Sequence, residues 1–168
     1  MIAAADVHYR EDKAVGVIVL FTEWESESIH SFEKIEFTGK YSEYIPGEFY
    51  KRELPILLSL HEKIKDAALE AFIVDGYVYL GLEEKPGLGY YVYQKLGGSI
   101  PVIGAAKSRF KDNSENCREL YRGKSTKPMY ITSVGISSED ALRKMQKMKG
   151  NFRIPDILST LDRMTKEF

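Results

Sequence analysis

The chain opens with the stretch Ile2-Ala3-Ala4-Ala5-Asp6-Val7-His8-Tyr9, in which small and β-branched residues surround a single carboxylate. A second apolar run, rich in valine and isoleucine, follows at residues 14–21, and residues 28–37 alternate imperfectly between apolar and polar positions. Continuous apolar runs are typical of buried strands, and alternation is typical of a strand with one exposed face. The three segments therefore predict a meander of three strands at the start of the fold.

After the meander the apolar residues change their spacing. Residues 48–68 repeat apolar side chains with a period near 3.6, which predicts an amphipathic helix that carries Pro55 in its first turns. Further strands are predicted at residues 71–74, 101–105 and 129–134, and further helices at residues 89–96, 138–148 and 154–168. The third of these four helices begins at a capping box, Ser137-Ser138-Glu139-Asp140. This order predicts an α/β fold, a mixed β-sheet flanked by helices on both faces, in a single domain over residues 1–168.

Composition narrows the class of protein. The 168 residues are 43% apolar and 29% charged, which is typical of one folded domain. The single cysteine, Cys117, cannot form an intramolecular disulfide and lacks neighbouring zinc ligands, so we expect a reducing cytoplasm. No apolar run approaches the roughly 18–20 residues that span a bilayer, so we expect neither membrane insertion nor secretion. We expect a monomer.

The net charge of −1 argues against a protein that coats nucleic acid through overall basicity. Residues 107–127 nevertheless carry a local formal charge of +4. The cations of this segment are Lys107, Arg109, Lys111, Arg118, Arg122, Lys124 and Lys127. Two interpretations remain open at this stage, a basic face for nucleic acid and a solvated loop.

Three carboxylates occupy positions where burial is expected to be costly. Asp6 lies within an apolar strand, Asp75 lies where a strand ends, and Glu53 shares the apolar stripe of its helix with Leu57 and Leu60. Taken singly, a helical glutamate is usually solvated and a strand-end aspartate often caps a turn. Together, their order along the chain resembles that of an RNase-H-like core, in which such acids hold divalent cations. Clustered carboxylates favour Mg²⁺, with Mn²⁺ as an alternative, over zinc.

Four blocks of sequence make the resemblance specific. They are Tyr44-Ile45-Pro46-Gly47 followed by Arg52-Glu53-Leu54-Pro55, then Val74-Asp75-Gly76, then Ile100-Pro101-Val102-Ile103-Gly104-Ala105-Ala106-Lys107-Ser108-Arg109, and finally Phe152-Arg153-Ile154-Pro155. In this order, over residues 4–162, they resemble the endonuclease V family. The resemblance implies a metal-dependent endonuclease that recognises inosine in RNA or deoxyinosine in DNA. Such an enzyme hydrolyses the second phosphodiester bond on the 3′ side, in DNA repair or RNA processing.

The resemblance also implies roles for individual residues. The metal-binding and catalytic acids are Asp6, Glu53 and Asp75, and Lys107 is the catalytic lysine near the scissile phosphate. The expected substrate contacts are a wedge of Tyr44, Ile45 and Pro46, backbone at Gly47 and Gly76 beside the altered base, and the side chains of Arg52, Ser108 and Arg109. A base that leaves the helix fits this expectation, because mispaired bases cost less to unstack.

The chain departs from the family pattern in three places. A family Gly-His before the last-but-one helix is replaced by Val134-Gly135 running into Ile136, so Glu139 or Asp140 either substitutes for the histidine or caps the helix. Residues 77–86 differ from the family's Gly-x-Ala-His-Pro stretch, and the expected domain lacks the family's N-terminal helical extension. Two alternatives therefore stay open: a non-catalytic nucleic-acid-binding module, and an RNase-H-like nuclease with a different substrate.

Overall fold

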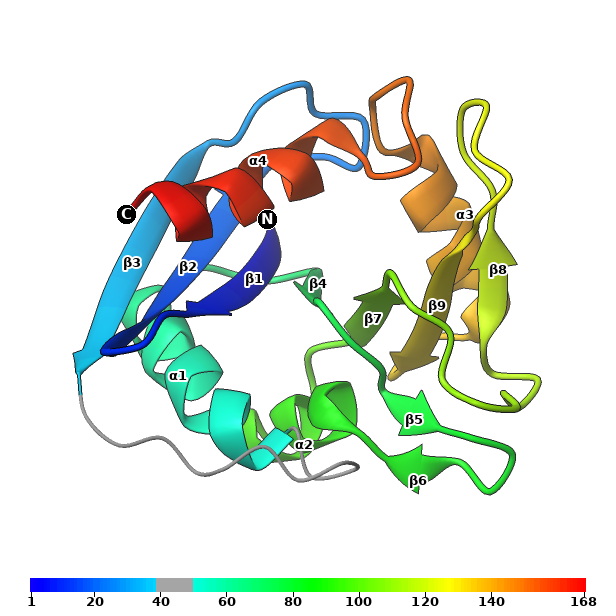
Figure 1. Ribbon diagram of the computed structural model, residues 1–168, viewed down its shortest axis with the longest axis horizontal. Coiled ribbons are helices and arrows are strands. Elements are labelled where there is room, and N and C mark those ends of the chain that lie inside the picture. Colours follow the sequence, from blue (N-terminus) through cyan, green and yellow to red (C-terminus); the bar gives the residue numbers. More distant parts are fainter. Residues whose placement is uncertain (39–49) are drawn as a thin grey trace.

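A mixed β-sheet runs through the middle of the protein (Figure 1). The computed structural model describes residues 1–38 and 50–168. Its strands are β1 (Ile2–Tyr9), β2 (Lys13–Phe21), β3 (Ser31–Thr38), β4 (Ala71–Val74), β5 (Tyr79–Leu80), β6 (Lys85–Pro86), β7 (Val102–Ala106), β8 (Arg118–Leu120) and β9 (Met129–Val134). Its helices are α1 (Tyr50–Lys63), α2 (Leu88–Lys95), α3 (Ser138–Lys147) and α4 (Asp156–Glu167).

The sheet combines a parallel centre with antiparallel flanks. Within the described residues the strand order is β3-β2-β1-β4-β7-β9-β8, and β5 and β6 form a separate hairpin. β1, β4 and β7 are parallel neighbours, whereas β2 and β3 on one side and β9 and β8 on the other are antiparallel. The carboxyl ends of the three parallel strands therefore meet at one edge of the sheet, where open α/β sheets usually bind ligands.

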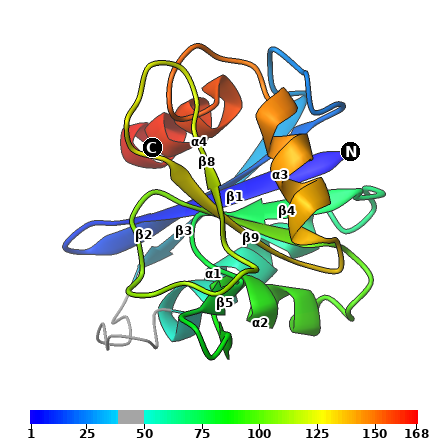
Figure 2. The same cartoon turned by 90° about the vertical axis from the view of Figure 1, so that its right-hand side faces the viewer.

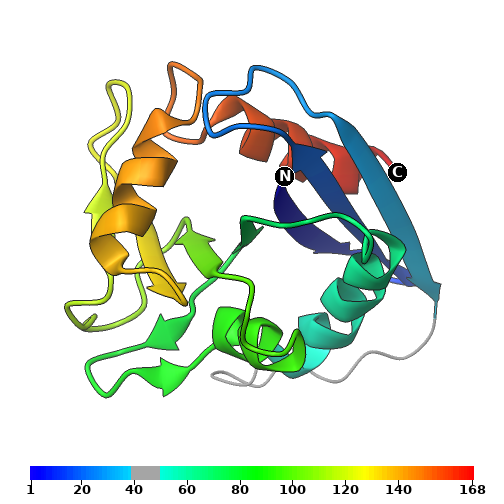
Figure 3. The same ribbon diagram turned by 180° about the vertical axis from the view of Figure 1, so that it is seen from behind.

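Two helical layers cover the sheet. Helices α3 and α4 lie on one side of the sheet, and α1 and α2 lie on the other (Figure 2). Figure 3 shows the same arrangement from behind. Side chains of β1 alternate between two cores: Ala4 packs in the core with α3 and α4, whereas Ala3 and Ala5 pack in the core with α1 and α2. The prediction of a mixed sheet with helices on both faces is confirmed.

The elements agree closely with those expected from sequence, and the differences are local. The helix predicted over residues 48–68 ends at Lys63, because the chain turns there with Ile64 N–H donating to His61 and Ala67 N–H donating to Ile64. Ile64 remains buried in the core after the turn, which explains why the apolar period continued. The last helix begins at Asp156 rather than at residue 154. Strands β5, β6 and β8 were not predicted.

The basic segment at residues 107–127 needs one correction. Arg122 is buried, with 8% of its surface exposed, and its guanidinium donates to the carbonyls of Met145, Met148, Gly150 and Phe152. It therefore satisfies backbone oxygens at and beyond the end of α3 instead of contributing to a basic face.

Among the described residues, no helix has the length and apolar composition that crossing a membrane requires.

Candidate active site

The register of the parallel strands places two of the expected acids next to each other. Ala5 of β1 pairs with Val74 of β4, so Asp6 and Asp75 follow as the next residues on adjacent strands. Asp6 alternates with Ala4, and Asp75 alternates with Ile73, so both acids point to the face that α3 and α4 cover. Lys107 follows the end of β7 and points to the same face, because it alternates with Ala105.

Asp6 is held in an environment that disfavours its charge. Only 9% of its surface is exposed, and its Oδ1 accepts a hydrogen bond from the backbone N–H of Val7 at 2.8 Å. Burial raises the pKa of Asp6 to about 7, and repulsion from Asp75 adds to this effect, while Lys107 works against it. Burial also raises the pKa of Asp75. Asp75 therefore disfavours the charged form of Asp6, and Lys107 offsets this effect only in part.

Glu53 approaches these acids from the opposite helical layer. It lies on α1, in the same stripe as the buried Leu57 and Leu60, and is only 5% exposed. Burial raises the pKa of Glu53 well above its usual value, and repulsion from Asp6 and then Asp75 raises it further. Its carboxylate therefore lies within electrostatic reach of both aspartates. No described residue forms an ion pair with it, so a cation would stabilise its charged form.

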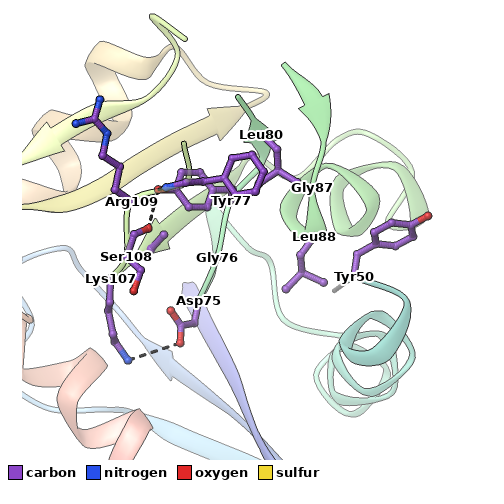
Figure 4. A pocket seen from close by; sticks show the side chains of 12 residues that line it. Tyr50, Asp75, Gly76, Tyr77, Leu80, Gly87, Leu88, Lys107, Ser108 and Arg109 are labelled. Atoms are coloured by element: carbon purple, nitrogen blue, oxygen red, sulfur yellow. Dashed lines mark hydrogen bonds and ion pairs between the residues drawn. The ribbon is translucent and has the colours of Figure 1, made fainter. Parts of the chain in front are cut away.

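Lys107 joins the strand-end acids to the last helix. Its Nζ lies 3.6 Å from Oδ2 of Asp75 and 3.6 Å from Oδ1 of Asp162 on α4. The close-up view shows the side chains of Lys107 and Asp75 pointing toward each other from neighbouring strand ends (Figure 4). Burial alone would lower the pKa of Lys107, but Asp75, Asp162 and Asp6 outweigh it and raise that pKa. The lysine is thus charged and provides the local counter-charge.

Asp162 is a member of this group that sequence reasoning missed. It raises the pKa of Asp6 and Asp75, and Lys166 donates a hydrogen bond to its Oδ2 at 2.9 Å. The sequence signal was weak, because Asp162 lies next to the buried Leu161 but is not itself one of the buried residues of α4, whereas Glu53 is one of the buried residues of α1. By contrast, Asp140 lies in the first turn of α3, where its backbone N–H donates to the hydroxyl of the N-cap residue Ser137 and its carboxylate pairs with Arg143, and Glu139 is exposed beside it. Within the described residues, the fourth acid of the cluster is Asp162.

The donor set, carboxylate oxygens, is the kind that a hard divalent cation prefers. A cavity of about 20 Å³, lined by Asp6, Asp75, Lys107 and Leu161, is large enough for one water-sized particle. In residues 1–38 and 50–168, no three His, Cys, Asp or Glu side chains are grouped so that they could hold a metal as they stand. The expected convergence of the three acids is thus incomplete, and Lys107 occupies the position beside Asp75.

A larger pocket of about 500 Å³ opens beside the acids. We call it the inner pocket. Its lining includes Asp75, Gly76, Tyr77, Leu88, Lys107 and Ser108 (Figure 4). Its floor depends on a close approach of two backbones, because a Cβ at Gly104 of β7 would lie 2.5 Å from the carbonyl oxygen of Gly76. The same approach lets Val78 N–H donate to Oγ1 of Thr132 at 2.8 Å. Glycine at position 104 therefore fixes the chain that follows Asp75.

Tyr77 fastens the loop that carries Lys107. It is 8% exposed, and its hydroxyl donates to the carbonyl of Ser108 at 2.8 Å and accepts from the N–H of Phe110 at 3.1 Å. Burial raises the pKa of Tyr77 to about 12, so the hydroxyl stays protonated and keeps both bonds. Arg153 holds the same loop from the other side by donating to the carbonyl of Lys107. The expected catalytic lysine is therefore backed by two fixed side chains.

The remaining expected substrate contacts divide into three groups. Gly76 and Ser108 line the inner pocket. Arg109 also lines it, but the guanidinium of Arg109 points away from the pocket (Figure 4). Nε of Arg109 donates to the Lys111 carbonyl at 3.2 Å. Arg52 stacks on Tyr9, with its guanidinium carbon 3.6 Å from the ring centroid. The expected wedge residues Tyr44, Ile45 and Pro46, and Gly47 after them, lie outside the described residues.

Comparisons with known proteins agree with the resemblance. Residues 1–122 match the family model of endonuclease V. The chain is 30% identical to an endonuclease V of Pyrococcus horikoshii, over 98% of this chain and 72% of that protein. It is 28% identical to an endonuclease V of Ignicoccus hospitalis, over 73% of this chain and 62% of that protein. The aligned part of the chain thus spans less than two thirds of the Ignicoccus protein's length.

The fold also matches a solved structure. A crystal structure of Ciona intestinalis endonuclease V, in complex with a 24mer DNA that contains an inosine followed by a ribo-adenosine, superposes with a TM-score of 0.78. The match covers 99% of this chain and 84% of that chain at 18% identity. At this identity the likeness shows the fold alone, and the fold is the expected RNase-H-like one.

Proposed function

The chain belongs to the endonuclease V family, a family of nucleases, and from this premise we propose that it is a metal-dependent endonuclease acting on inosine-containing DNA or RNA. The bond hydrolysed is the second phosphodiester on the 3′ side of the inosine. One observation carries the proposal: Asp6, Asp75, Lys107 and Asp162 lie together at the carboxyl edge of the parallel strands, next to the inner pocket.

The acids of the site would hold the cation. Asp6, Glu53 and Asp75 provide carboxylate oxygens, which are the donors that Mg²⁺ and Mn²⁺ prefer, and Asp162 is available as a fourth. A divalent cation held there would supply Lewis acidity, the property by which such ions lower the pKa of a bound water and offset negative charge on a phosphate. The raised pKa values of Asp6 and Glu53 mean that cation binding is accompanied by loss of protons.

Lys107 has two duties in this proposal. Without substrate its ammonium pairs with both Asp75 and Asp162 and offsets part of their negative charge. With substrate bound, the same charge stands beside the phosphate and stabilises negative charge as the bond breaks. Tyr77 and Arg153 hold the backbone on either side of this lysine and so limit the positions that its ammonium can reach.

The inner pocket is the proposed receptor for the altered base. Its volume of about 500 Å³ falls in the range of small-ligand pockets, and Tyr77 and Leu88 offer apolar surface while Gly76 and Ser108 offer backbone and hydroxyl groups. A base enters such a pocket only when it is unstacked, and a mispaired inosine costs less to unstack than a normal base. Arg52 and Arg109 are proposed to contact phosphates outside the pocket. Tyr44, Ile45 and Pro46 are proposed to form the wedge, and the backbone at Gly47 to approach the altered base.

The test is cleavage of labelled strands that carry one inosine, as DNA and as RNA, with Mg²⁺, Mn²⁺ or EDTA. We expect a cut one nucleotide beyond the inosine, lost in EDTA and lost in Asp75→Asn. Asp66→Asn, which removes an exposed carboxylate from the segment after α1, is the matched control and should cut normally. Binding without cutting would contradict the proposal and favour a binding module.

The wall of the inner pocket favours a second candidate function. The β5–β6 hairpin, at the position where residues 77–86 depart from the family pattern, provides Leu80 to the wall of the inner pocket. A changed wall is compatible with a nuclease of the same chemistry and a different substrate. Metal-dependent cutting at equal rates with and without inosine in the strand would identify that function.

A further inference from the structure

A second pocket lies beyond the inner one, and we call it the outer pocket. It has a volume of about 520 Å³ and lies between the β5–β6 hairpin and the loop at residues 110–112. Its hairpin side includes Leu80, Leu82 and Pro86, and its loop side includes Phe110 and Lys111. It belongs to the segment in which the sequence departs most from the family, and the proposed function gives it no task.

The two pockets are neighbours. Leu80 and Phe110 line both of them, so these two side chains stand between an occupant of one pocket and an occupant of the other. Phe110 is kept in place from the inner side, because its backbone N–H donates to the Tyr77 hydroxyl and its ring lies 6.2 Å from the Tyr77 ring. The outer pocket is therefore the neighbouring cavity into which a nucleotide next to a base in the inner pocket could extend.

The lining of the outer pocket suits a base better than a phosphate. Leu80, Leu82 and Phe110 provide apolar and aromatic surface for a flat ring, and Lys111 holds its Nζ 6.0 Å from the centre of the Phe110 ring. The carboxylates of Glu83 and Asp112 are matched by the ammonium groups of Lys85 and Lys111, and Lys85 pairs with Glu83 at 3.6 Å, so the lining has no net positive charge that would attract a phosphate. Aromatic stacking of this kind is the usual way in which proteins hold unpaired bases.

The backbone around the pocket is under local strain. Among the described residues, two non-glycine residues have a positive φ: Glu84 at 52° in the hairpin, and Lys111 at 29° in the facing loop. Such conformations are unfavourable for L-residues and concentrate at ligand clamps. One lies on each side of the outer pocket, which indicates that both walls are held in a particular shape.

We propose that the outer pocket binds the unpaired base of the nucleotide adjacent to the inosine, stacked on Phe110. The inference rests on the proposed function and extends it, because it makes the neighbouring nucleotide a second element of recognition. It predicts that the enzyme grips two consecutive unstacked bases, one on each side of the wall formed by Leu80 and Phe110.

The test uses single strands with one inosine and the fluorescent base 2-aminopurine at either neighbouring position. Anisotropy reports binding, the fluorescence of 2-aminopurine reports stacking, and cleavage is followed separately. We expect quenching at one of the two positions on binding, and an increase in KM of about tenfold when that nucleotide is made abasic, with little change in kcat. The double variant Leu82→Ala, Lys111→Ala should lose both effects. Tyr121→Ala combined with Lys147→Ala, exposed residues that line neither pocket, should keep them.

The outcomes separate the two proposals. Inosine-dependent cleavage without quenching at either position, or quenching that survives in the double variant, overturns the outer-pocket assignment and leaves the proposed function standing. Quenching that the double variant abolishes, in a protein that binds the strand without cutting it, supports the assignment and contradicts the endonuclease. A wild-type protein that does not bind the inosine strand overturns both.

Discussion

The ammonium of Lys107 lies 3.6 Å from a carboxylate oxygen of Asp162, which connects the end of β7 to the middle of α4. Through this contact the last helix takes part in a site that otherwise belongs to the parallel strands and α1. Asp162 also lies beyond the part of the chain that the family model matches, residues 1–122.

Replacing Asp162 tests whether the last helix belongs to the active site. In Asp162→Asn we expect weaker Mn²⁺ binding and a cleavage rate lower by about 10² or more, because one candidate ligand and one partner of Lys107 are lost together. Titration calorimetry and single-turnover cleavage measure the two effects. Glu167→Gln, which removes the partner of Arg163 at the exposed end of the same helix, is the control. Wild-type cleavage by Asp162→Asn would remove this residue from the site.

Lys107→Met separates cation binding from catalysis. Its removal leaves Asp75 without its ammonium and Asp162 with that of Lys166 alone, so a divalent cation no longer competes with Lys107 and should bind more tightly. Cleavage should nevertheless fall by about 10² or more, because the charge beside the phosphate is gone. Lys65→Met, which breaks the exposed pair with Glu62, should change neither value. Equal losses of cation binding and cleavage in Lys107→Met would contradict the proposal that Lys107 competes with the cation and stabilises charge on the phosphate.

Tyr77→Phe tests the support of the lysine loop. The variant leaves the Ser108 carbonyl and the Phe110 N–H without their partner, which should lower the free energy of unfolding by about 1–3 kcal/mol. We also expect a lower kcat, since the loop that carries Lys107 loosens. Urea denaturation and steady-state kinetics measure both. The control is Tyr121→Phe, because the Tyr121 hydroxyl donates to Glu119 at an exposed position. Full stability of Tyr77→Phe would show that these bonds contribute nothing.

The pKa of Asp6 predicts how stability depends on pH in the metal-free protein. Burial raises this pKa from 3.8 to about 7, so the folded state holds the proton more tightly than the unfolded state. The resulting stabilisation is complete below the unfolded value and is lost as the pH rises through the folded one. In EDTA, the free energy of unfolding should therefore fall from about pH 5 to about pH 7 by up to about 1.4 kcal/mol per unit.

Asp6→Asn should flatten much of that slope, whereas Asp12→Asn, at an exposed position, should leave it unchanged. Part of the slope should persist in Asp6→Asn, because burial raises the pKa of Glu53 in the same direction. Urea denaturation across this range measures the slope. A metal-free protein whose stability rises over the same interval would contradict the assigned environment of Asp6.

The sequence predicted the elements that have enough residues to show a period. β1, β4 and β9 agree residue by residue with the predicted strands, and the capping box correctly marked the start of α3. β5 and β6 have two residues each, and β8 has three, so no period can be recognised in them. Such short pairings depend on the surrounding fold rather than on local sequence.

The site could be predicted in part for similar reasons. Asp6 and Asp75 were recognisable because each follows apolar strand residues, and the parallel register then brings them together. Asp162 was not predicted, because Glu139 and Asp140 were the acids considered as replacements for the absent family histidine. These two residues instead lie at the start of α3. The buried position of Arg122 could not be seen in the sequence, because its partners are backbone carbonyls that only the end of α3 brings near.

The most direct test of the central claim is anomalous diffraction from crystals of the wild-type protein soaked in Mn²⁺. We predict a metal peak bonded to Asp6 and Asp75, within reach of Glu53, with the Lys107 ammonium moved away from Asp75. A saturated crystal in which Mn²⁺ binds only elsewhere, and Lys107 still pairs with Asp75, would contradict it.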